Sequence, residues 1–481
     1  MTSQALPALD PKEKSSYRDQ ICHFFIDSIE SGSLSAGTRM PPSRELADRL
    51  GVSRDTVVRA YEELKRLAFI ESDSTRGYRV STRKISRPRE APPETRSANL
   101  SAYGRKILSR LDSSPLISDF AQLNYGGPPL DLLPVKRWRN CLKTAADKIG
   151  SFDHHPELLG KPELRKEIAA YLHRNKQISA RGENVVIFTS TISATNLLCR
   201  ILMNAGDCLA IEDPGFGGIK DIAALQNLEI FSVPVDEEGL MVDELRKAPE
   251  PVKLVYITPG KQEPTGAVLS LERRKALLSW ASENDAWIIE DDFDGFFDYG
   301  KSKLPAVAGI ATMNRNDRVI YLSTFWRLLY PLTGLGFCLL PDSLKAVVEQ
   351  GKIEVEAVAE SATQIALTLL LEDGYLEKYT RRLKAHYLDR RNRCIENIRT
   401  LFGQDLELKG GGSGTQLNLK SARYSQEELF AAANNSGLPL ISTAGYYLSE
   451  KPDGSFNLDF SIMSEVEIDK KCREFFKSLN P

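Results

Sequence analysis

The sequence has no long apolar stretch, and this absence narrows the classes of protein that it can encode. Among its 481 residues, apolar runs such as Ile365–Leu371 are far shorter than the roughly 20 residues that a membrane-spanning helix needs. The first residues, MTSQALPALDPKEK, contain no apolar segment of the kind found in a secretory signal. We therefore expect a protein that acts in the cytoplasm and contacts no membrane.

Cysteine pairs and an excess of positive charge are also missing. The seven cysteines form no Cys-x-x-Cys pair, so neither a disulfide framework nor a zinc site is predicted. Lysine and arginine total 63 against 65 acidic residues, which gives a net charge of −2. Any contact with nucleic acid must therefore come from a local patch and not from the overall charge.

The composition changes along the chain and predicts three zones. Residues 1–82 have the pattern of helices followed by short strands. Residues 83–114 are rich in Pro, Ser, Arg and Lys and lack a sustained apolar period, which is typical of an exposed linker. Residues 115–481 are long enough for a large domain with a sizeable core.

Apolar runs alternate with amphipathic stretches beyond the linker, which predicts βαβ units and a mostly parallel sheet. The runs are Val185–Phe188, Cys208–Glu212, Ile230–Val235, Leu254–Thr258, Trp287–Glu290, Val319–Leu322 and Phe337–Leu340. A helical stretch from about Glu354 to Leu401, shorter strands and a last helix after Ser464 predict a smaller C-terminal α/β subdomain. No internal repeat is visible.

The stretch PPSRELADRLGVSRDTVVRAYEELKRLAFI predicts a helix, a tight turn and a second helix. Ser43 is expected to cap a helix that runs through Leu50, and Gly51 supplies the turn. Ser53 is expected to cap a second helix beginning at Arg54.

The second helix has an apolar and a polar face. The residues expected in the core recur at helical spacing: Val57, Tyr61, Leu64 and Ala68. The residues expected on the opposite, polar face are Asp55, Arg59 and Glu62. Arg54 and Thr56 flank the N-terminal end, which in helix-turn-helix proteins meets base edges and phosphates. The next residues, FIESDSTRGYRVST, read as a two-stranded wing with Arg76–Gly77 at its tip.

Residues from about Tyr17 to Arg83 resemble the GntR family of winged-helix regulators, through SGSLSAGTRMPPSRELADRLGVSRDTVVRAYEELKRLAFIES and STRGYRV. The resemblance implies that the partner is double-stranded operator DNA. It places Ser43 and Arg44 on backbone phosphates. It places further residues at the groove and the wing tip: Ser53, Arg54, Thr56 and Arg59 at the groove, and Gly77 at the tip.

Residues from about Leu123 to Leu479 resemble the fold type I aminotransferases, most strongly over four stretches: Gly160–Leu172, Ala205–Gly218, Thr258–Leu278 and Trp287–Tyr299. Together with the N-terminal module, the chain resembles the MocR subfamily of GntR regulators. The resemblance implies a multidomain α/β protein with a large, mostly parallel sheet domain and a smaller subdomain. It also implies a homodimer that pairs head to tail.

The same resemblance implies a pyridoxal phosphate site. Asp291 stands where an acid pairs with the ring nitrogen, and Phe216 is expected near the pocket. Arg327 stands at the position of the Schiff-base lysine, and a guanidinium remains protonated and cannot form an aldimine. Other positions also depart from the family's pattern. Trp326 stands in place of a serine, Gly334 in place of an arginine, Phe293 in place of a tyrosine and Asn457 in place of an arginine. Residues 189–195 (TSTISAT) lack the family's Gly and Gln.

These departures predict a degenerate site, no covalent pyridoxal phosphate and a pseudo-aminotransferase that serves dimerisation or effector sensing. Arg327 is expected either to bind a phosphate- or carboxylate-bearing effector or to pair internally with Asp291 or another acid. The alternatives are a regulator that holds pyridoxal phosphate non-covalently and a bifunctional pyridoxal-dependent aminotransferase. Lys261 is the one candidate for a substitute amine.

Overall fold

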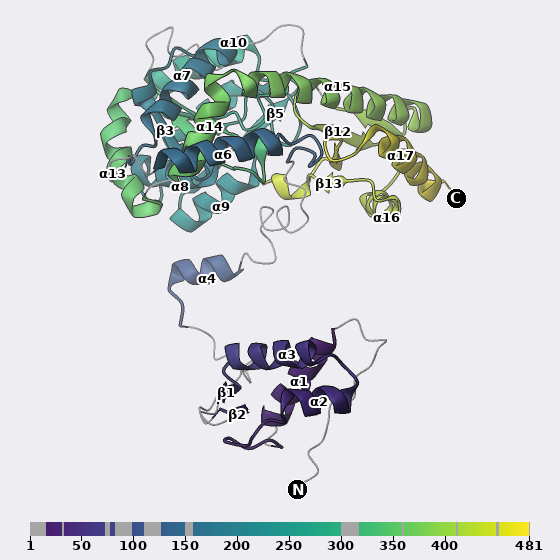
Figure 1. Cartoon of the computed structure of the whole chain (residues 1–481). Coiled ribbons are helices and arrows are strands. Elements are labelled where there is room, and N and C mark those ends of the chain that lie inside the picture. Colours follow the sequence, from purple (N-terminus) through teal and green to yellow (C-terminus); the bar gives the residue numbers. More distant parts are fainter. Residues whose placement is uncertain are drawn as a thin grey trace. The chain divides into compact units, whose positions relative to one another are not determined.

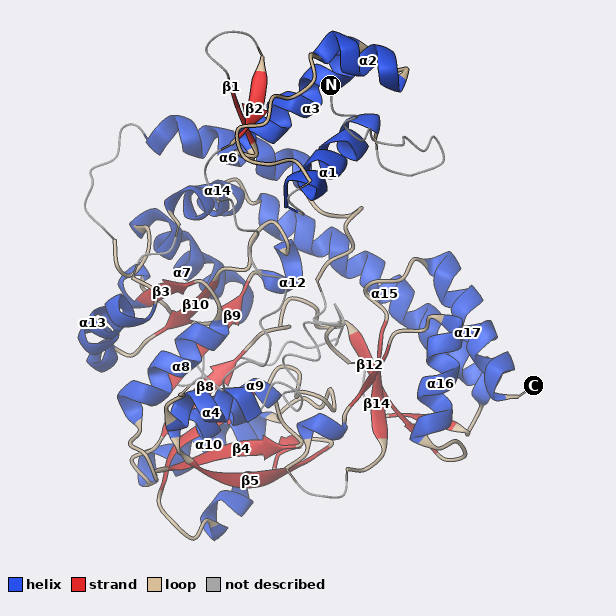
Figure 2. Cartoon of the chain, turned by 90° about the horizontal axis from the view of Figure 1, so that it is seen from below, coloured by secondary structure: helices blue, strands red, loops and turns tan. Residues whose placement is uncertain are grey.

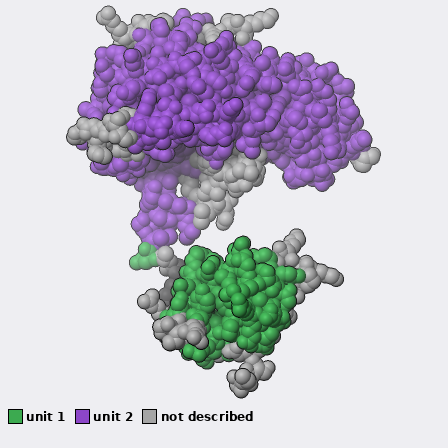
Figure 3. Space-filling view, in the orientation of Figure 1, with its two compact units in different colours: residues 1–99 green, residues 100–481 purple. Residues whose placement is uncertain are grey.

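The structure is a computed structural model. It describes residues 16–30, 33–72, 77–81, 99–109, 127–149, 157–299, 317–357, 360–409, 412–448 and 452–480. The chain divides into two compact units, Met1–Asn99 and Leu100–Pro481 (Figure 3).

The first unit has the helix-turn-helix and the two-stranded wing that the sequence predicts, and a further helix precedes them. The helices are α1 (Tyr17–Glu30), α2 (Ser43–Leu50) and α3 (Arg54–Arg66), and the antiparallel strands are β1 (Ile70–Ser72) and β2 (Tyr78–Val80). The predicted core residues Val57, Tyr61 and Leu64 of α3 are buried together with side chains of α1 and α2. Gly51 closes the turn after α2 in the left-handed conformation that glycine adopts readily.

Two details of this unit differ from the sequence expectations. Ser43 does not cap α2, because the cap position is Pro42 and Ser43 is already the first helical residue. Ala68 is not a core residue of α3, because the helix ends at Arg66. Ala68 instead takes a φ of 61° in the turn toward β1 and is exposed. The apolar spacing therefore predicts a longer helix than the structure has, because it extends the core face of α3 past Arg66 to Ala68.

The second unit, whose main helices are labelled in Figure 1, is built on an eight-stranded sheet with the order β3-β10-β9-β8-β7-β4-β5-β6. The strands are β3 (Val185–Phe188), β4 (Cys208–Asp213), β5 (Glu229–Asp236), β6 (Gly239–Leu240), β7 (Val252–Ile257), β8 (Trp287–Asp291), β9 (Val319–Thr324) and β10 (Gly336–Leu339). The run from β5 to β9 is parallel, while β10 is antiparallel to both neighbours. The prediction of a mostly parallel sheet is confirmed.

Helices cover both faces of this sheet (Figure 2). Those that share one core are α6 (Val135–Ile149), α7 (Pro162–Lys176), α10 (Leu271–Glu283) and α14 (Ser361–Glu372), and those that share the other are α8 (Thr191–Leu202), α9 (Gly217–Gln226) and α13 (Lys345–Val355). A short helix, α12 (Trp326–Leu329), follows β9. Asp291 is the last residue of β8, and Arg327 lies in α12, which follows the end of the neighbouring strand β9.

The C-terminal subdomain is smaller, as expected. Its antiparallel sheet has the order β11-β12-β14-β13, and its elements are α15 (Tyr375–Phe402), β11 (Leu406–Leu408), β12 (Gln416–Ser421), α16 (Gln426–Ser436), β13 (Leu440–Ser442), β14 (Ser455–Asp459) and α17 (Glu465–Leu479). The single helical stretch expected from Glu354 to Leu401 is broken, and Gly374 turns the chain with a φ of 64° before α15. Ser464 caps the last helix.

Most of the predicted linker, residues 83–114, lies outside the described residues. Its described part includes a helix that the sequence pattern did not predict, α4 (Ala102–Ser109), which belongs to the second unit. Lys106 Nζ donates a hydrogen bond of 2.9 Å to the carbonyl of Ala224 in α9. No helix in the described part of the chain is long and apolar enough to cross a membrane.

Candidate functional site

The N-terminal end of α3 presents the residues expected to meet DNA. Ser53 caps the helix, and its Oγ accepts a hydrogen bond of 3.1 Å from the Thr56 amide. The Ser53 and Thr56 hydroxyls also lie 2.8 Å apart. Arg54 is exposed. The side chain of Arg59 is two-thirds exposed and pairs with Asp55 at 2.8 Å, one helical turn away. An approaching phosphate would compete with Asp55 for this arginine.

The other residues expected at the DNA lie on α2 and the wing. Arg44 is exposed near the start of α2, and Ser43 beside it is half-buried. Gly77 is exposed at the base of β2 and has a φ of 109°, a conformation that favours glycine. Arg76 lies outside the described residues.

In the second unit, Asp291 lies at the end of β8 and is buried. Its Oδ2 accepts a hydrogen bond from the hydroxyl of Tyr256 on the neighbouring β7. Burial raises the pKa of Asp291 to about 7, because a buried carboxylate loses its hydration. Phe216 packs nearly parallel to the Tyr256 ring, with the centroids 6.3 Å apart. Tyr256 thus joins the two expected pocket residues Asp291 and Phe216.

Arg327 and Lys261 converge on one buried carboxylate. Lys261 Nζ lies 3.1 Å from Asp294 Oδ2, and Arg327 Nε lies 3.9 Å from Asp294 Oδ1. The two cationic groups also approach the ring of Phe293, at 5.5 and 5.4 Å from its centroid. The internal ion-pair partner that the structure gives Arg327 is therefore Asp294, while Asp291 bonds to Tyr256.

Trp326 occupies the space next to Gly334. Its indole stacks on Tyr330 with the ring centroids 3.7 Å apart. A Cβ atom at position 334 would lie 2.9 Å from Trp326 Cε3, which is closer than two carbon atoms pack. The glycine and the tryptophan are therefore sterically matched.

The other positions singled out in the sequence, Asn457 and residues 189–195, form hydrogen bonds with groups of the protein itself. Asn457 donates to Gln416 Oε1 at 3.2 Å and accepts from Asn418 Nδ2 at 2.9 Å, so it forms an amide ladder between β14 and β12. At the start of α8, the Thr189 amide donates to Glu356 Oε2 at 3.1 Å. A carboxylate of the chain itself thus lies where residues 189–195 were expected to meet a phosphate.

Comparison with known protein families finds a different family match in each of the two units. Residues 118–473 match the family of aminotransferases class I and II, and residues 18–80 match the bacterial regulatory proteins of the gntR family. The chain belongs to the MocR-type GntR regulators. These regulators join a helix-turn-helix domain to an aminotransferase-type domain, which is the arrangement described above.

Relatives of this MocR-type regulator match over almost its whole length. The HTH-type transcriptional regulator YhdI of Bacillus subtilis is 29% identical over 96% of this chain and 95% of its own. The probable rhizopine catabolism regulatory protein MocR of Rhizobium meliloti is 29% identical over 94% and 90%. The pyridoxine biosynthesis regulator PdxR of Corynebacterium glutamicum is 29% identical over 84% of each chain.

Solved structures show the same fold for the second unit of the MocR-type regulator. The α-aminoadipate aminotransferase LysN of Thermus thermophilus superposes with a TM-score of 0.70 at 20% identity, covering 78% of this chain and 97% of its own. An archaeal alanine:glyoxylate aminotransferase gives a TM-score of 0.68 at 25% identity, with 78% and 95% covered.

Several residues of the pocket carry no local signal in the sequence. Tyr256 lies on β7 and bonds to Asp291. Tyr387 lies on α15 and Asp459 at the end of β14, and only the fold brings these two into the electrostatic field of Arg327. Asp294 had a weak signal, because it belongs to the unusually acidic run EDDFD that also holds Asp291.

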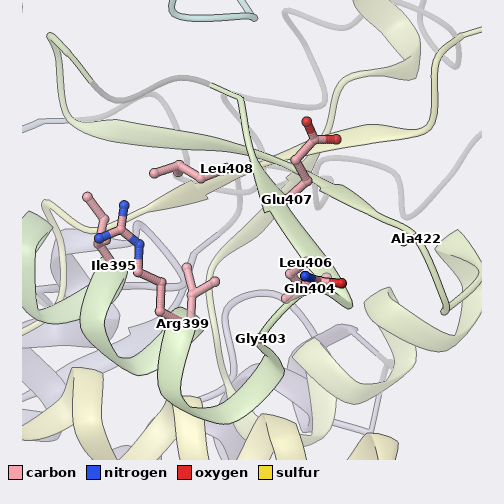
Figure 4. A pocket seen from close by; sticks show the side chains of 9 residues that line it. Ile395, Arg399, Gly403, Gln404, Leu406, Glu407, Leu408 and Ala422 are labelled. Carbon is pink, nitrogen blue, oxygen red and sulfur yellow. The ribbon is translucent and has the colours of Figure 1, made fainter.

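Two open clefts lie elsewhere in the second unit of this MocR-type regulator. One, of about 650 Å³, is lined by α7, α15 and the loop after β8, and includes Lys176, Asp292 and Arg381. The other, of about 410 Å³, lies between the end of α15 and β11. Figure 4 shows Arg399 on its helical wall and Glu407 on its strand wall.

Proposed function

We propose that this MocR-type regulator acts in the cytoplasm, that it binds operator DNA through α3 and the wing, and that its aminotransferase-type domain serves dimerisation and effector sensing instead of catalysis. The observation that carries the DNA-binding role is the start of α3, where Ser53 caps the helix and Arg54 is exposed. An arginine in this place can bind guanine bidentately.

The residues present fit only part of pyridoxal phosphate. Asp291 Oδ1 is buried and has no hydrogen-bond partner among the described residues, so it can accept from a ring nitrogen. Covalent attachment is not supported, because Arg327 cannot form an aldimine. Trp326 packs where an arginine at position 334 would have to pass. The domain is therefore proposed to be a pseudo-aminotransferase.

Lys261 is a poor substitute for the missing amine. A Schiff base needs a neutral, accessible amine. Lys261 is buried, and its Nζ contacts Asp294. Non-covalent pyridoxal phosphate remains the second candidate, and the observations that favour it are the free Asp291 Oδ1 and the adjacent Phe216–Tyr256 stack. An anionic effector is less well supported, because Arg327 already faces Asp294.

Dimerisation is supported by apolar side chains on the surface of the second unit. Leu130 is 73% exposed and Val135 is 49% exposed. Helix α4 exposes Tyr103, Ile107 and Leu108 and buries none of its residues. Apolar surface of this kind is typical of an interface with another chain, and we propose that it is a second copy in a head-to-tail homodimer.

The test of this function is DNA binding by the full-length protein. Genome-wide binding should recover a recurring operator, and a gel shift with that operator should show a complex whose affinity falls as salt rises. Light scattering at micromolar concentration should show a dimer. A purified protein that remains folded and binds no recovered sequence above its affinity for random DNA would contradict the proposal.

A further inference from the structure

The start of helix α8 faces a carboxylate from the end of α13. Glu356 directly follows α13, and its Oε2 accepts hydrogen bonds from the Thr189 amide at 3.1 Å and from the Thr189 hydroxyl. The Ser193 hydroxyl lies 3.5 Å from the same oxygen. The amino end of a helix carries a partial positive charge that favours an anion. The side chain of Glu356, which is only 9% exposed, therefore fills an anion position at the start of α8.

A buried lysine faces the same carboxylate from α13. Lys352 lies one helical turn before Glu356, its side chain is fully buried, and its Nζ lies 3.6 Å from Glu356 Oε1. The same Nζ donates to the Ala357 carbonyl at 3.1 Å and lies 5.5 Å from the centroid of the Phe188 ring. Burial lowers the pKa of Lys352, and the charge of Glu356 opposes this shift. The anion position thus has a second source of positive charge, independent of the helix terminus.

The two oxygens of Glu356 are unequally bonded. Oε2 accepts from both donors of Thr189, while Oε1 is buried and has no hydrogen-bond partner among the described residues. The 3.6 Å to Lys352 is longer than a hydrogen bond. A phosphate group has three strong acceptor oxygens. It would therefore match the donors of this position better than a carboxylate does, if Glu356 were absent.

The filled position borders the pocket of Asp291. A Cβ atom at Gly218 would lie 2.5 Å from the Phe216 ring and 3.1 Å from Cδ1 of Ile192, in the first turn of α8. Both side chains therefore lie around one point. Phe216 stacks on Tyr256, and Tyr256 bonds to Asp291. A ligand in the pocket of Asp291 that carried a phosphate would bring it toward the start of α8.

We infer that Glu356 determines ligand specificity: its carboxylate occupies the anion position at the start of α8 and keeps phosphate groups out of the neighbouring pocket. A phosphate entering there would meet a like charge at short range and would compete for donors that Glu356 already uses. The effector sensed by this domain is then a molecule without a phosphate group. This inference rests on the proposed function, because a working pyridoxal phosphate site has to hold a phosphate.

The experiment titrates the full-length protein with inorganic phosphate in a calorimeter. Glu356→Ala should bind phosphate about tenfold or more tightly than wild type, because it leaves Lys352 and the start of α8 without their anion. Glu354→Ala is the matched control. It removes the same charge from an exposed position of the same helix, and should behave as wild type. Adding Lys352→Met to Glu356→Ala should weaken phosphate binding by about tenfold or more.

A second variant keeps the test decisive if Glu356→Ala does not fold. Glu356→Gln keeps the size and an acceptor oxygen for Thr189, and it no longer repels an anion, so it should also bind phosphate more tightly than wild type. Equal phosphate affinity of wild type and the Glu356 variants, or an affinity that Lys352→Met leaves undiminished, would overturn the inference.

Reduction with borohydride in the presence of pyridoxal phosphate separates this inference from the proposed function. A wild-type chain that binds inorganic phosphate as tightly as the Glu356 variants but forms no pyridoxyl adduct contradicts only the role of Glu356. A stoichiometric adduct in a wild-type chain that excludes inorganic phosphate contradicts the proposed function instead.

Discussion

The indole of Trp326 packs against the α-carbon of Gly334, so that a methyl group at position 334 would meet Trp326 Cε3 at 2.9 Å. The stack of Trp326 on Tyr330 leaves the indole little freedom to move away. The two residues are therefore coupled: a side chain at position 334 requires the tryptophan to shift or to be absent.

This coupling predicts a non-additive pair of substitutions. Gly334→Ala should destabilise the protein by about 1–3 kcal/mol, the usual cost of overpacking. In a Trp326→Ser background the same change should cost much less, and urea unfolding of the four proteins measures the difference. Gly336→Ala is the control, because its methyl group would meet the backbone nitrogen of Thr191 at 2.9 Å and not the indole. Equal costs of Gly334→Ala in both backgrounds would contradict the coupling.

Two tyrosines of α15 predict opposite effects of losing a hydroxyl. Tyr379 OH donates to the carbonyl of Leu328 at 3.0 Å, so Tyr379→Phe should cost about 1 kcal/mol of unfolding free energy. Tyr387 OH has no partner among the described residues, so Tyr387→Phe should be neutral or stabilising. Chemical denaturation of both variants tests this pair. A larger loss at Tyr387 than at Tyr379 would show that its hydroxyl is bonded in solution.

Asp291 predicts a dependence of stability on pH. Burial raises its pKa to about 7 in the folded protein, above the value of about 4 in an unfolded chain. Between these values the folded state binds more protons, so this contribution to stability falls as the pH rises from about 4 to about 7. Asp291→Asn removes the contribution. Relative to wild type it should gain on the order of 1 kcal/mol per pH unit across this window.

Urea midpoints at pH 5, 6, 7 and 8 measure this prediction. Asp291→Asn retains an oxygen that can accept from Tyr256, so the comparison isolates the charge. The exposed Asp285→Asn serves as the control and should run parallel to wild type. If the Asp291→Asn and wild-type curves are also parallel, the carboxyl of Asp291 titrates as in the unfolded chain and the burial argument fails.

The two ends of α3 predict different roles in DNA binding. Arg54→Ala should weaken specific operator binding by about 1–3 kcal/mol, the range for a good base contact. Arg66 lies at the other end of the helix and pairs with Glu63 at 2.6 Å, so Arg66→Ala should change the affinity little. Gel-shift titrations at one fixed salt concentration compare the two. An unchanged operator affinity for Arg54→Ala would show that the recognition end of the helix is wrongly placed.

The sequence predicted the fold well wherever one periodic signal dominates. The buried strand Val185–Phe188 was predicted with the bounds that the structure has, because a short continuous apolar run is typical of a strand covered on both faces. Ser53 and Gly51 were placed correctly, because capping and a left-handed turn each need a particular residue type. Ala68 was misplaced, because spacing alone does not show where a helix ends.

The site was harder to predict, because its contacts join distant parts of the chain. Asp291, Phe216 and Arg327 were selected from the family resemblance, but the partner of Arg327 was not identified as Asp294. Helix α4 was missed because its apolar side chains are exposed, so no local core imposes a period on it. The close approach of Trp326 to Gly334 depends on a turn geometry that composition does not encode.

The central claim, a DNA-binding regulator whose aminotransferase-type domain no longer does pyridoxal chemistry, has one direct test. The wild-type protein and Arg327→Lys are mixed with pyridoxal phosphate, reduced with borohydride, and mapped by mass spectrometry for modified lysines. We predict no stoichiometric adduct in the wild type, at Lys261 or any other pocket lysine, and only a low yield at position 327 in the variant. One pyridoxyl group per wild-type chain on Lys261 would contradict the account, because it would show that the site has been rebuilt around a different amine.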